Sequence, residues 1–236
     1  MAFDLRRSVD VVTSLGASAA RLGSGMSVAG VGKQPVQPLA LYDFEACPYC
    51  RKVREAFSIL DLDADVYPCP QGGPRFREEV RRRGGKAQFP YLVDPNTGVA
   101  MYESDDIIRY LTREYGDGSV PRLLALGPLT LAGSALASGW RLGRGGRYRP
   151  AREAAQPLEL WSFEASPYCR IAREALCELE LPYVLHNVAK GSAKRDAFVR
   201  RSGKMQVPYL VDPNTSAALF ESADIVHYLE DTYAKK

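Results

Sequence analysis

Short runs of apolar residues alternate along this chain with segments in which apolar positions recur every three to four residues. The run 39–44 predicts a buried strand. Residues 48 to about 60 predict a helix, because Pro48 suits a first helical turn, where its missing N–H has no partner to lose. A second strand is predicted around 66–67. A basic second helix is predicted from Pro74 to the glycine pair 84–85.

The next segment predicts a hairpin and one more helix. Strands are expected over 91–93 and 99–102, on either side of the turn-forming run Asp-Pro-Asn-Thr-Gly. Ser104 is expected to cap the following helix, and the acidic pair 105–106 favours the positive end of the helix dipole. The predicted order is βαβαββα, a mixed four-stranded sheet with helices on its faces.

The whole pattern occurs twice. Residues 38–51, PLALYDFEACPYCR, return 119 positions later as 157–170, PLELWSFEASPYCR. Residues 88–97 return 118 positions later as 206–215. Two copies indicate a duplication, since a solenoid needs three or more short units. We therefore expect an α/β chain with two tandem domains, 38–116 and 157–236, preceded by an N-terminal helical segment (1–37) and an apolar helical linker (117–156).

Two stretches of small apolar residues precede the copies, at 11–20 and 123–140. The second has 18 residues without a charge, which is the lower limit for a membrane span. Its Gly-Pro pair at 127–128 interrupts a helix, and alanine, serine and glycine dilute its hydrophobicity. We expect both stretches to be helices that pack on the domains. Membrane association is the less favoured alternative.

Composition and charge narrow the class of partner. Apolar residues make up 46% of the chain and charged residues 25%, as in ordinary globular proteins, and a net charge of +3 gives no argument for nucleic acid. Five cysteines are an odd number and form no disulfide framework. One C-x-x-C in a strand–helix setting indicates redox chemistry in a reducing compartment, and the N-terminus does not resemble a secretory signal.

The segment Cys47-Pro48-Tyr49-Cys50 stands where a strand passes into a helix. A cysteine there faces unpaired N–H groups and the positive end of the helix dipole, which stabilise thiolate over thiol. We expect Cys47 to be the nucleophile and Cys50, one helical turn later, to resolve a mixed disulfide on it. A structural cysteine pair is the alternative, and no metal site is expected, since a four-cysteine zinc site lacks its second pair.

Two further motifs recur in both copies. Pro90 and Pro208 each begin a strand, either as ordinary edge prolines or with a cis peptide bond that presents the preceding backbone to a peptide-like ligand. The pairs Glu103-Ser104 and Glu221-Ser222 each open the last helix of a copy.

Cys-Pro-Tyr-Cys, x-Pro-Tyr-Leu and Glu-Ser-x-Asp-Ile-x-x-Tyr-Leu together resemble glutaredoxins. More closely, they resemble the N-terminal, thioredoxin-fold domain of glutathione transferases, and of glutaredoxins that share this domain, over about 39–116 and 157–235. The tandem arrangement is similar to two-domain proteins of plastids and cyanobacteria. The resemblance implies two thioredoxin-like domains and location in the cytoplasm or the chloroplast. The chain departs from the transferase pattern in one respect that counts against conjugation, since we expect only the short apolar segments where transferases continue into an all-helical domain.

The resemblance also implies a glutathione site. Glu103 and Ser104 would hold the γ-glutamyl end, and the Phe89 backbone beside Pro90 would pair with the cysteinyl amide, which places the sulfur at Cys47. Pro48 and Tyr49 of the dithiol motif belong to the same site. By the same matching, a second site comprises Ser166, Val207, Pro208, Glu221 and Ser222. Serine does not ionise near pH 7 but can donate a hydrogen bond to a glutathione thiolate.

The leading hypothesis is a glutathione-dependent thiol–disulfide oxidoreductase acting on glutathionylated or disulfide substrates. The second copy would then bind glutathione or serve only as a packing partner. The alternatives are a glutathione transferase-like conjugating enzyme, a module that carries glutathione or a glutathione-ligated iron–sulfur cluster with Cys47 as a ligand, and a non-catalytic scaffold. The sequence makes no prediction of oligomeric state.

Overall fold

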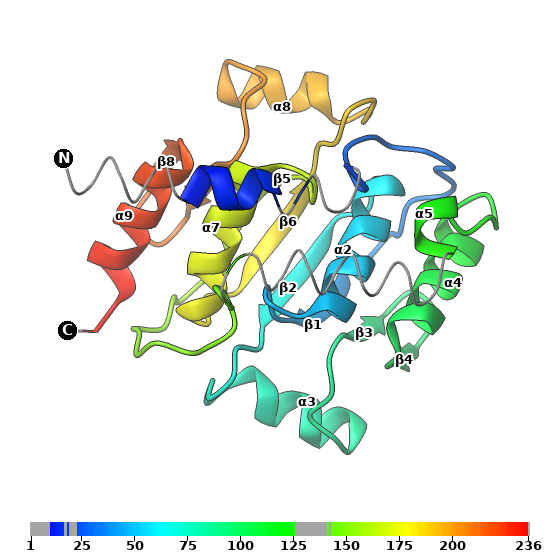
Figure 1. Ribbon diagram of the computed structural model, residues 1–236, viewed down its shortest axis with the longest axis horizontal. Coiled ribbons are helices and arrows are strands. Elements are labelled where there is room, and N and C mark those ends of the chain that lie inside the picture. The colour runs from blue at the N-terminus through cyan, green and yellow to red at the C-terminus, as the bar shows by residue number, and fades with distance from the viewer. Residues whose placement is uncertain (1–9, 17, 19–22, 126–140, 142, 236) are drawn as a thin grey trace.

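The computed structural model describes residues 10–16, 18, 23–125, 141 and 143–235. The first copy contains β1 (Leu39–Asp43), α2 (Pro48–Ile59), β2 (Ala64–Pro68), α3 (Phe76–Gly84), β3 (Tyr91–Asp94), β4 (Val99–Met101) and α4 (Ser104–Tyr115), followed by the short α5 (Arg122–Ala125). The second copy contains β5 (Leu158–Ser162), α7 (Pro167–Glu178), β6 (Tyr183–Asn187), α8 (Arg195–Ser202), β7 (Tyr209–Asp212), β8 (Ala217–Phe220) and α9 (Ser222–Tyr233). The predicted βαβαββα order is confirmed twice (Figure 1).

The strands of both copies form one continuous sheet, in the order β4-β3-β1-β2-β6-β5-β7-β8. In each copy the central strand pairs in parallel with one neighbour, as β1 does with β2, and antiparallel with the other, as β1 does with β3. The two halves meet where β2 pairs antiparallel with β6, with Ala64 opposite Leu185 and Val66 opposite Tyr183. This pairing covers one edge of each four-stranded unit, so the two copies share backbone hydrogen bonds as well as side-chain contacts.

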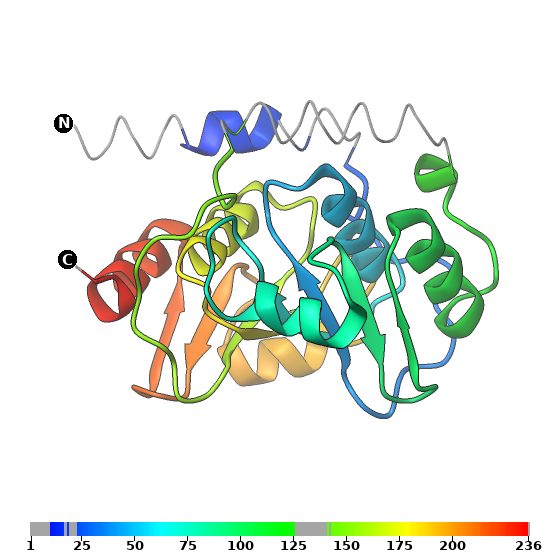
Figure 2. The same cartoon turned by 90° about the horizontal axis from the view of Figure 1, so that it is seen from below.

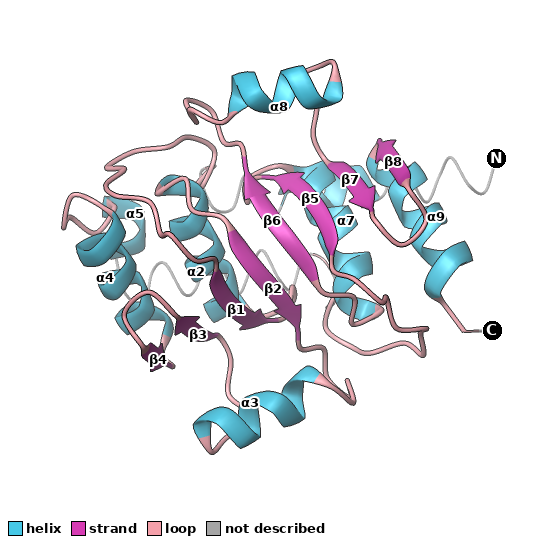
Figure 3. Ribbon diagram, turned by 180° about the vertical axis from the view of Figure 1, so that it is seen from behind, coloured by secondary structure: helices cyan, strands magenta, loops and turns pink. Residues whose placement is uncertain are grey.

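Helices cover the sheet unequally. Seen from behind, the strands lie in front of α2, α4, α7 and α9, which occupy one face (Figure 3). Side chains alternate along β1, so Leu39 and Leu41 join the main core with residues of α2 and α4. Tyr42 points to the opposite face, where it packs with Phe76 and Val80 of α3. β1 is therefore packed on both of its faces, and it leads into the loop that precedes α2.

The basic helix α3 begins later than the predicted Pro74. At this start Glu180 of the second copy accepts hydrogen bonds from the backbone N–H groups of Arg75 (3.1 Å) and Phe76 (3.2 Å). A carboxylate from another part of the chain thus satisfies donors that a helix leaves unpaired at its first turn. The helix ends as predicted at Gly84, with Gly85 in the left-handed conformation.

Residues 10–16 form a helical segment, as predicted for the first apolar stretch, and it lies on the side of the second copy (Figure 2). Ser14 donates its hydroxyl to the carbonyl of Pro167 (2.7 Å), and Arg170 donates to the carbonyl of Ser14 (2.7 Å). Most of the second apolar stretch, 126–140, lies outside the described residues. Among the helices that are described, none has the length and hydrophobicity to cross a membrane.

Candidate functional site

Cys47 is the N-cap residue of α2. Its Sγ atom accepts a hydrogen bond from the backbone N–H of Cys50, at 3.3 Å, and Pro48 occupies the first turn as predicted. Cys47 is 4% exposed and Cys50 is 0% exposed. Of the two sulfurs, the one nearer the surface is therefore the one at the helix N-terminus, where a thiolate is stabilised.

The two thiols differ in their ionisation. The hydrogen bond with the Cys50 thiol lowers the pKa of Cys47. The backbone N–H groups of Cys50 and Tyr49 and the charge of Arg54 lower it further, against the opposing effect of burial. Burial raises the pKa of Cys50 well above its usual range, and the bond to Cys47 adds to this effect. Of the two thiols, Cys47 is therefore the one that ionises more readily.

The second copy repeats this geometry without the dithiol. Ser166 is the N-cap of α7, and its Oγ atom accepts a hydrogen bond from the N–H of Cys169 at 3.2 Å. Cys169 is fully buried, and burial raises its pKa. Ser18 lies against this helix start, since it donates to the carbonyl of Ala165 (2.8 Å). A hydroxyl stands where the first copy has the Cys47 sulfur, in an otherwise matching backbone arrangement.

Both prolines predicted to begin a strand follow a cis peptide bond, at Phe89–Pro90 and Val207–Pro208. Pro90 and Pro208 are buried and directly precede β3 and β7. The structure thus has the cis alternative of the two that the sequence leaves open.

The prediction that Ser104 caps α4 is wrong. Glu103 is the N-cap residue, and Ser104 is the buried first residue of the helix. Glu103 has a φ of 69° and Glu221 a φ of 63°, in the left-handed region that few residues other than glycine adopt. The left-handed turn at glutamate starts the helix one residue after it, and it leaves the glutamate side chain exposed. Neither glutamate makes a capping hydrogen bond with its side chain.

The structure brings the proline loop and the glutamate–serine turn together. Gln88, next to Phe89, donates its side-chain amide to the carboxylate of Glu103, and Gln206 does the same to Glu221. Sequence reasoning did not single out these glutamines as site residues, although their recurrence at equivalent positions was a usable signal.

An aromatic contact joins the proline loop to the loop before Cys47. The rings of Phe44 and Phe89 meet edge to face, with centroids 6.1 Å apart, and the guanidinium of Arg77 lies 4.8 Å from the Phe89 ring centroid. Arg77 also donates to the carbonyls of Cys69 and Pro70. Nothing in the sequence pattern indicated this connection, because it joins residues from three separate segments. The three predicted parts of the first site are thus linked by contacts.

Cys69, whose part the sequence leaves open, is fully buried, and its thiol donates to the carbonyl of Tyr67 (3.3 Å). Burial raises its pKa well above the usual range, so it stays protonated. Its hydrogen-bond partner is only two residues earlier in the chain, at the end of β2, which indicates a role in packing.

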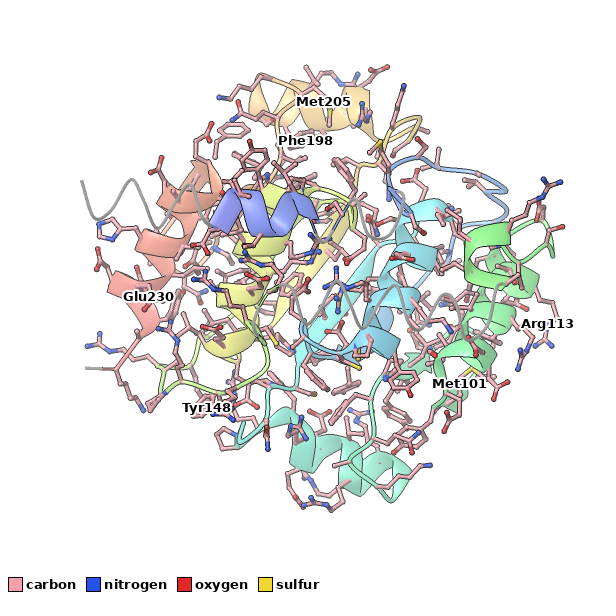
Figure 4. All side chains as sticks on the ribbon, in the orientation of Figure 1. Met101, Arg113, Tyr148, Phe198, Met205 and Glu230 are labelled. Atoms are coloured by element: carbon pink, nitrogen blue, oxygen red, sulfur yellow. The ribbon has the colours of Figure 1, made fainter. Side chains whose placement is uncertain are left out.

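A cavity of about 510 Å³ lies between α7 and α9 in the second copy. Its walls include Ile171, Val226, Ser222 and Ala223, and its rim includes Glu230, which is labelled on α9 in Figure 4. At the positions of Ile171 and Ala223 the first copy has Lys52 and Asp105, which form an ion pair. The second copy therefore has two uncharged side chains where the first copy has the Lys52–Asp105 ion pair.

The chain matches the family described as glutathione S-transferase, N-terminal domain, over residues 41–119 and 160–236. A curated relative, the glutathione S-transferase-like protein OpS6 of Beauveria bassiana, is 32% identical over 80 residues, which cover 34% of this chain and 37% of the relative. The chain thus spans well under half of that relative's length.

Two solved structures show weaker likeness. A Bombyx mori glutathione transferase, BmGSTD1, is 29% identical with a TM-score of 0.32, over 36% of this chain and 38% of that one. TDR1 of Leishmania, described as a trimeric glutathione transferase, is 15% identical with a TM-score of 0.30, over 85% of this chain and 68% of that one.

Proposed function

Because the chain belongs to the glutathione S-transferase N-terminal domain family, we propose that it is a glutathione-dependent thiol–disulfide oxidoreductase. The observation that carries the proposal is the unequal pair at the start of α2. Cys47 has a lowered pKa and keeps a little exposure, whereas Cys50 is fully buried with a raised pKa. A nucleophilic thiolate beside a protonated second thiol is what dithiol exchange requires.

The proposed reaction begins with the Cys47 thiolate attacking the glutathione sulfur of a glutathionylated substrate. A Cys47–glutathione disulfide forms, and the substrate leaves as a thiolate that takes up a proton. A second glutathione thiolate then attacks the glutathione sulfur of this mixed disulfide, which releases oxidised glutathione and returns the Cys47 thiolate. In the dithiol route, Cys50 loses its proton and attacks Cys47 instead, which releases glutathione and leaves a Cys47–Cys50 disulfide that two glutathione molecules reduce.

The remaining site residues are assigned to glutathione binding. Glu103 and Ser104 hold the γ-glutamyl end, and the backbone of Phe89 pairs with the cysteinyl amide. The hydrogen bond from Gln88 to Glu103 supports this assignment, because it fixes the two segments relative to each other. Pro48 and Tyr49 border the sulfur position, and the Tyr49 side chain is exposed beside the dithiol.

Conjugation of glutathione to an electrophile is the second candidate function, located in the second copy. The cavity of about 510 Å³ supports it, because its lining includes Ser222, one of the proposed glutathione residues of that copy. A cavity of this volume is in the range that small ligands occupy. Ser166 would then donate a hydrogen bond to the glutathione thiolate.

One comparison separates the two functions. We expect the purified chain to reduce a glutathionylated peptide at a rate set by glutathione concentration, and to conjugate 1-chloro-2,4-dinitrobenzene with glutathione far more slowly. Both rates are measured in the same preparation, with oxidised glutathione followed through glutathione reductase and the conjugate by its absorbance. Rapid conjugation without peptide reduction would exclude the oxidoreductase proposal and favour the second candidate.

A further inference from the structure

We refer to seven of the buried charged side chains where the two copies meet as the interdomain charge cluster. All are 4% exposed or less. Four are arginines and three are carboxylates. The members are Arg51 and Arg54 from α2, Arg170 and Arg173 from α7, and Asp43, Glu45 and Glu164.

The contacts of the interdomain charge cluster cross between the copies reciprocally. Arg54 donates from Nε to Oε2 of Glu164 at 3.0 Å, and Arg173 donates from Nη2 to Oε1 of Glu45 at 3.2 Å. Each arginine also pairs with the glutamate of its own copy, Arg54 with Glu45 at 3.3 Å and Arg173 with Glu164 at 2.7 Å. Glu45 and Glu164 stand two residues before Cys47 and Ser166, so these pairs hold the loops that lead into both helix starts.

This arrangement bears directly on the dithiol. Arg54 lowers the pKa of Cys47, and the same guanidinium is bound by the second copy through Glu164. The second copy therefore sets how much of the Arg54 charge is compensated near the thiolate. On the first copy, the charged and titratable groups that face the dithiol or Arg54 include Cys50 and Arg51 on α2, Asp43 at the end of β1, and Glu45 in the following loop. From the second copy they include Glu164, Arg173, Cys177 and Tyr183.

Burial of such a cluster needs an explanation, because replacing buried ion pairs by apolar residues is often neutral or stabilising. The copies differ at one member of the cluster. Asp43 pairs with Arg54 in the first copy, whereas its counterpart Ser162 accepts a hydrogen bond from Arg173 at 3.1 Å in the second. The copy that carries the dithiol thus has an additional carboxylate beside its arginine.

We propose that Glu164, from the copy without the nucleophilic cysteine, is a positioning residue for the dithiol, which it acts on through Arg54. The inference rests on the proposed function, since it assigns the second copy a part in the reaction at Cys47. The second copy is then a component of the first copy's active site, whether or not it binds glutathione itself.

The test is the pH dependence of Cys47 alkylation by iodoacetamide in the reduced full chain, followed on the Cys47 peptide by mass spectrometry. In Glu164→Gln, Arg54 is less compensated, so we expect alkylation at pH 6 to be roughly threefold faster than in wild type, with the midpoint moved to lower pH. In Arg54→Gln we expect a change of similar size in the opposite direction. Glu164→Asp, which keeps the charge of the cluster, should shift the midpoint less than Glu164→Gln.

The matched control is Glu180→Gln. Glu180 is another buried glutamate of the second copy that binds the first copy, but it binds Arg75 and Phe76, whereas Glu164 binds Arg54. We expect its alkylation profile to match wild type. The inference would be overturned if the Glu164 variants had the wild-type profile, or if they shifted in the same direction as Arg54→Gln. An equal shift in Glu180→Gln would overturn it as well. Alkylation needs neither glutathione nor turnover, so a wild type without glutathione activity would refute the proposed function and leave this test in force.

Discussion

Cys47→Ser is expected to reduce the rate of glutathionylated-peptide reduction by about a hundredfold or more, because a serine hydroxyl does not ionise near pH 7 and is a far weaker nucleophile than a thiolate. The backbone should tolerate the change, since Ser166 occupies the equivalent N-cap position in the second copy with a matching hydrogen bond. The rate is measured with glutathione, glutathione reductase and NADPH, at several peptide concentrations.

Two further variants give this comparison its controls. Cys50→Ser should keep a substantial part of the activity, because free glutathione can resolve the mixed disulfide on Cys47. Cys169→Ser changes the equivalent buried position of the second copy and should leave the rate unchanged. A Cys47→Ser variant as active as wild type would place the nucleophile elsewhere in the chain.

The second large effect concerns stability. Arg173→Met is expected to lower the free energy of unfolding by about 3–5 kcal/mol, since it removes one partner from a buried set of ion pairs. Arg173 binds Glu45 and Glu164 and also donates to the Ser162 hydroxyl, so three buried acceptors lose a donor together. Urea unfolding monitored by circular dichroism measures the change.

Arg201→Met is the matched control for this experiment. Arg201 also pairs with a glutamate, Glu159, but at 3.4 Å and with half of its side chain exposed. Exposed pairs of this kind contribute about 1 kcal/mol or less. Equal losses in the two variants would show that the interdomain charge cluster contributes nothing beyond an ordinary surface pair.

Much of the fold could be predicted because each copy is locally consistent. The apolar run of β1, the proline that opens α2 and the hairpin turn between β3 and β4 each indicate their element without help from distant residues. The repeat strengthened every assignment, since the same pattern had to hold twice. The start of α3 was predicted two residues too early, and its first backbone donors bind Glu180, more than a hundred residues away, a contact that no local pattern indicates.

The join between the copies was not predictable from strand patterns. Strand β2 is short, and nothing in its residues says whether its outer edge faces solvent or another strand. The polar face of α2 was equally hard to interpret, because arginines three residues apart on a helix are typical of a solvated face. Arg51 and Arg54 are buried where Glu164, from the loop before α7, pairs with them.

Part of the candidate site was likewise visible only in three dimensions. The motifs around Cys47, Pro90 and Glu103 were recognised separately, but the contacts that link them run through Gln88, Phe44 and Arg77. The left-handed backbone at Glu103 was missed, because glutamate before serine is an ordinary sequence for a helix start. A φ of that sign is set by the turn from β4 into α4 and has no signature in residue type.

The most direct test of the dithiol proposal is to trap its first intermediate. The Cys50→Ser variant is mixed with a glutathionylated peptide in the absence of free glutathione, quenched with acid and digested, and the position of glutathione is determined by mass spectrometry. Glutathione attached to Cys47, in step with release of the free peptide thiol, is the predicted result. Glutathione on Cys69, Cys169 or Cys177 instead, or no transfer from the peptide, would contradict the proposal that Cys47 is the nucleophile of a glutathione-dependent oxidoreductase.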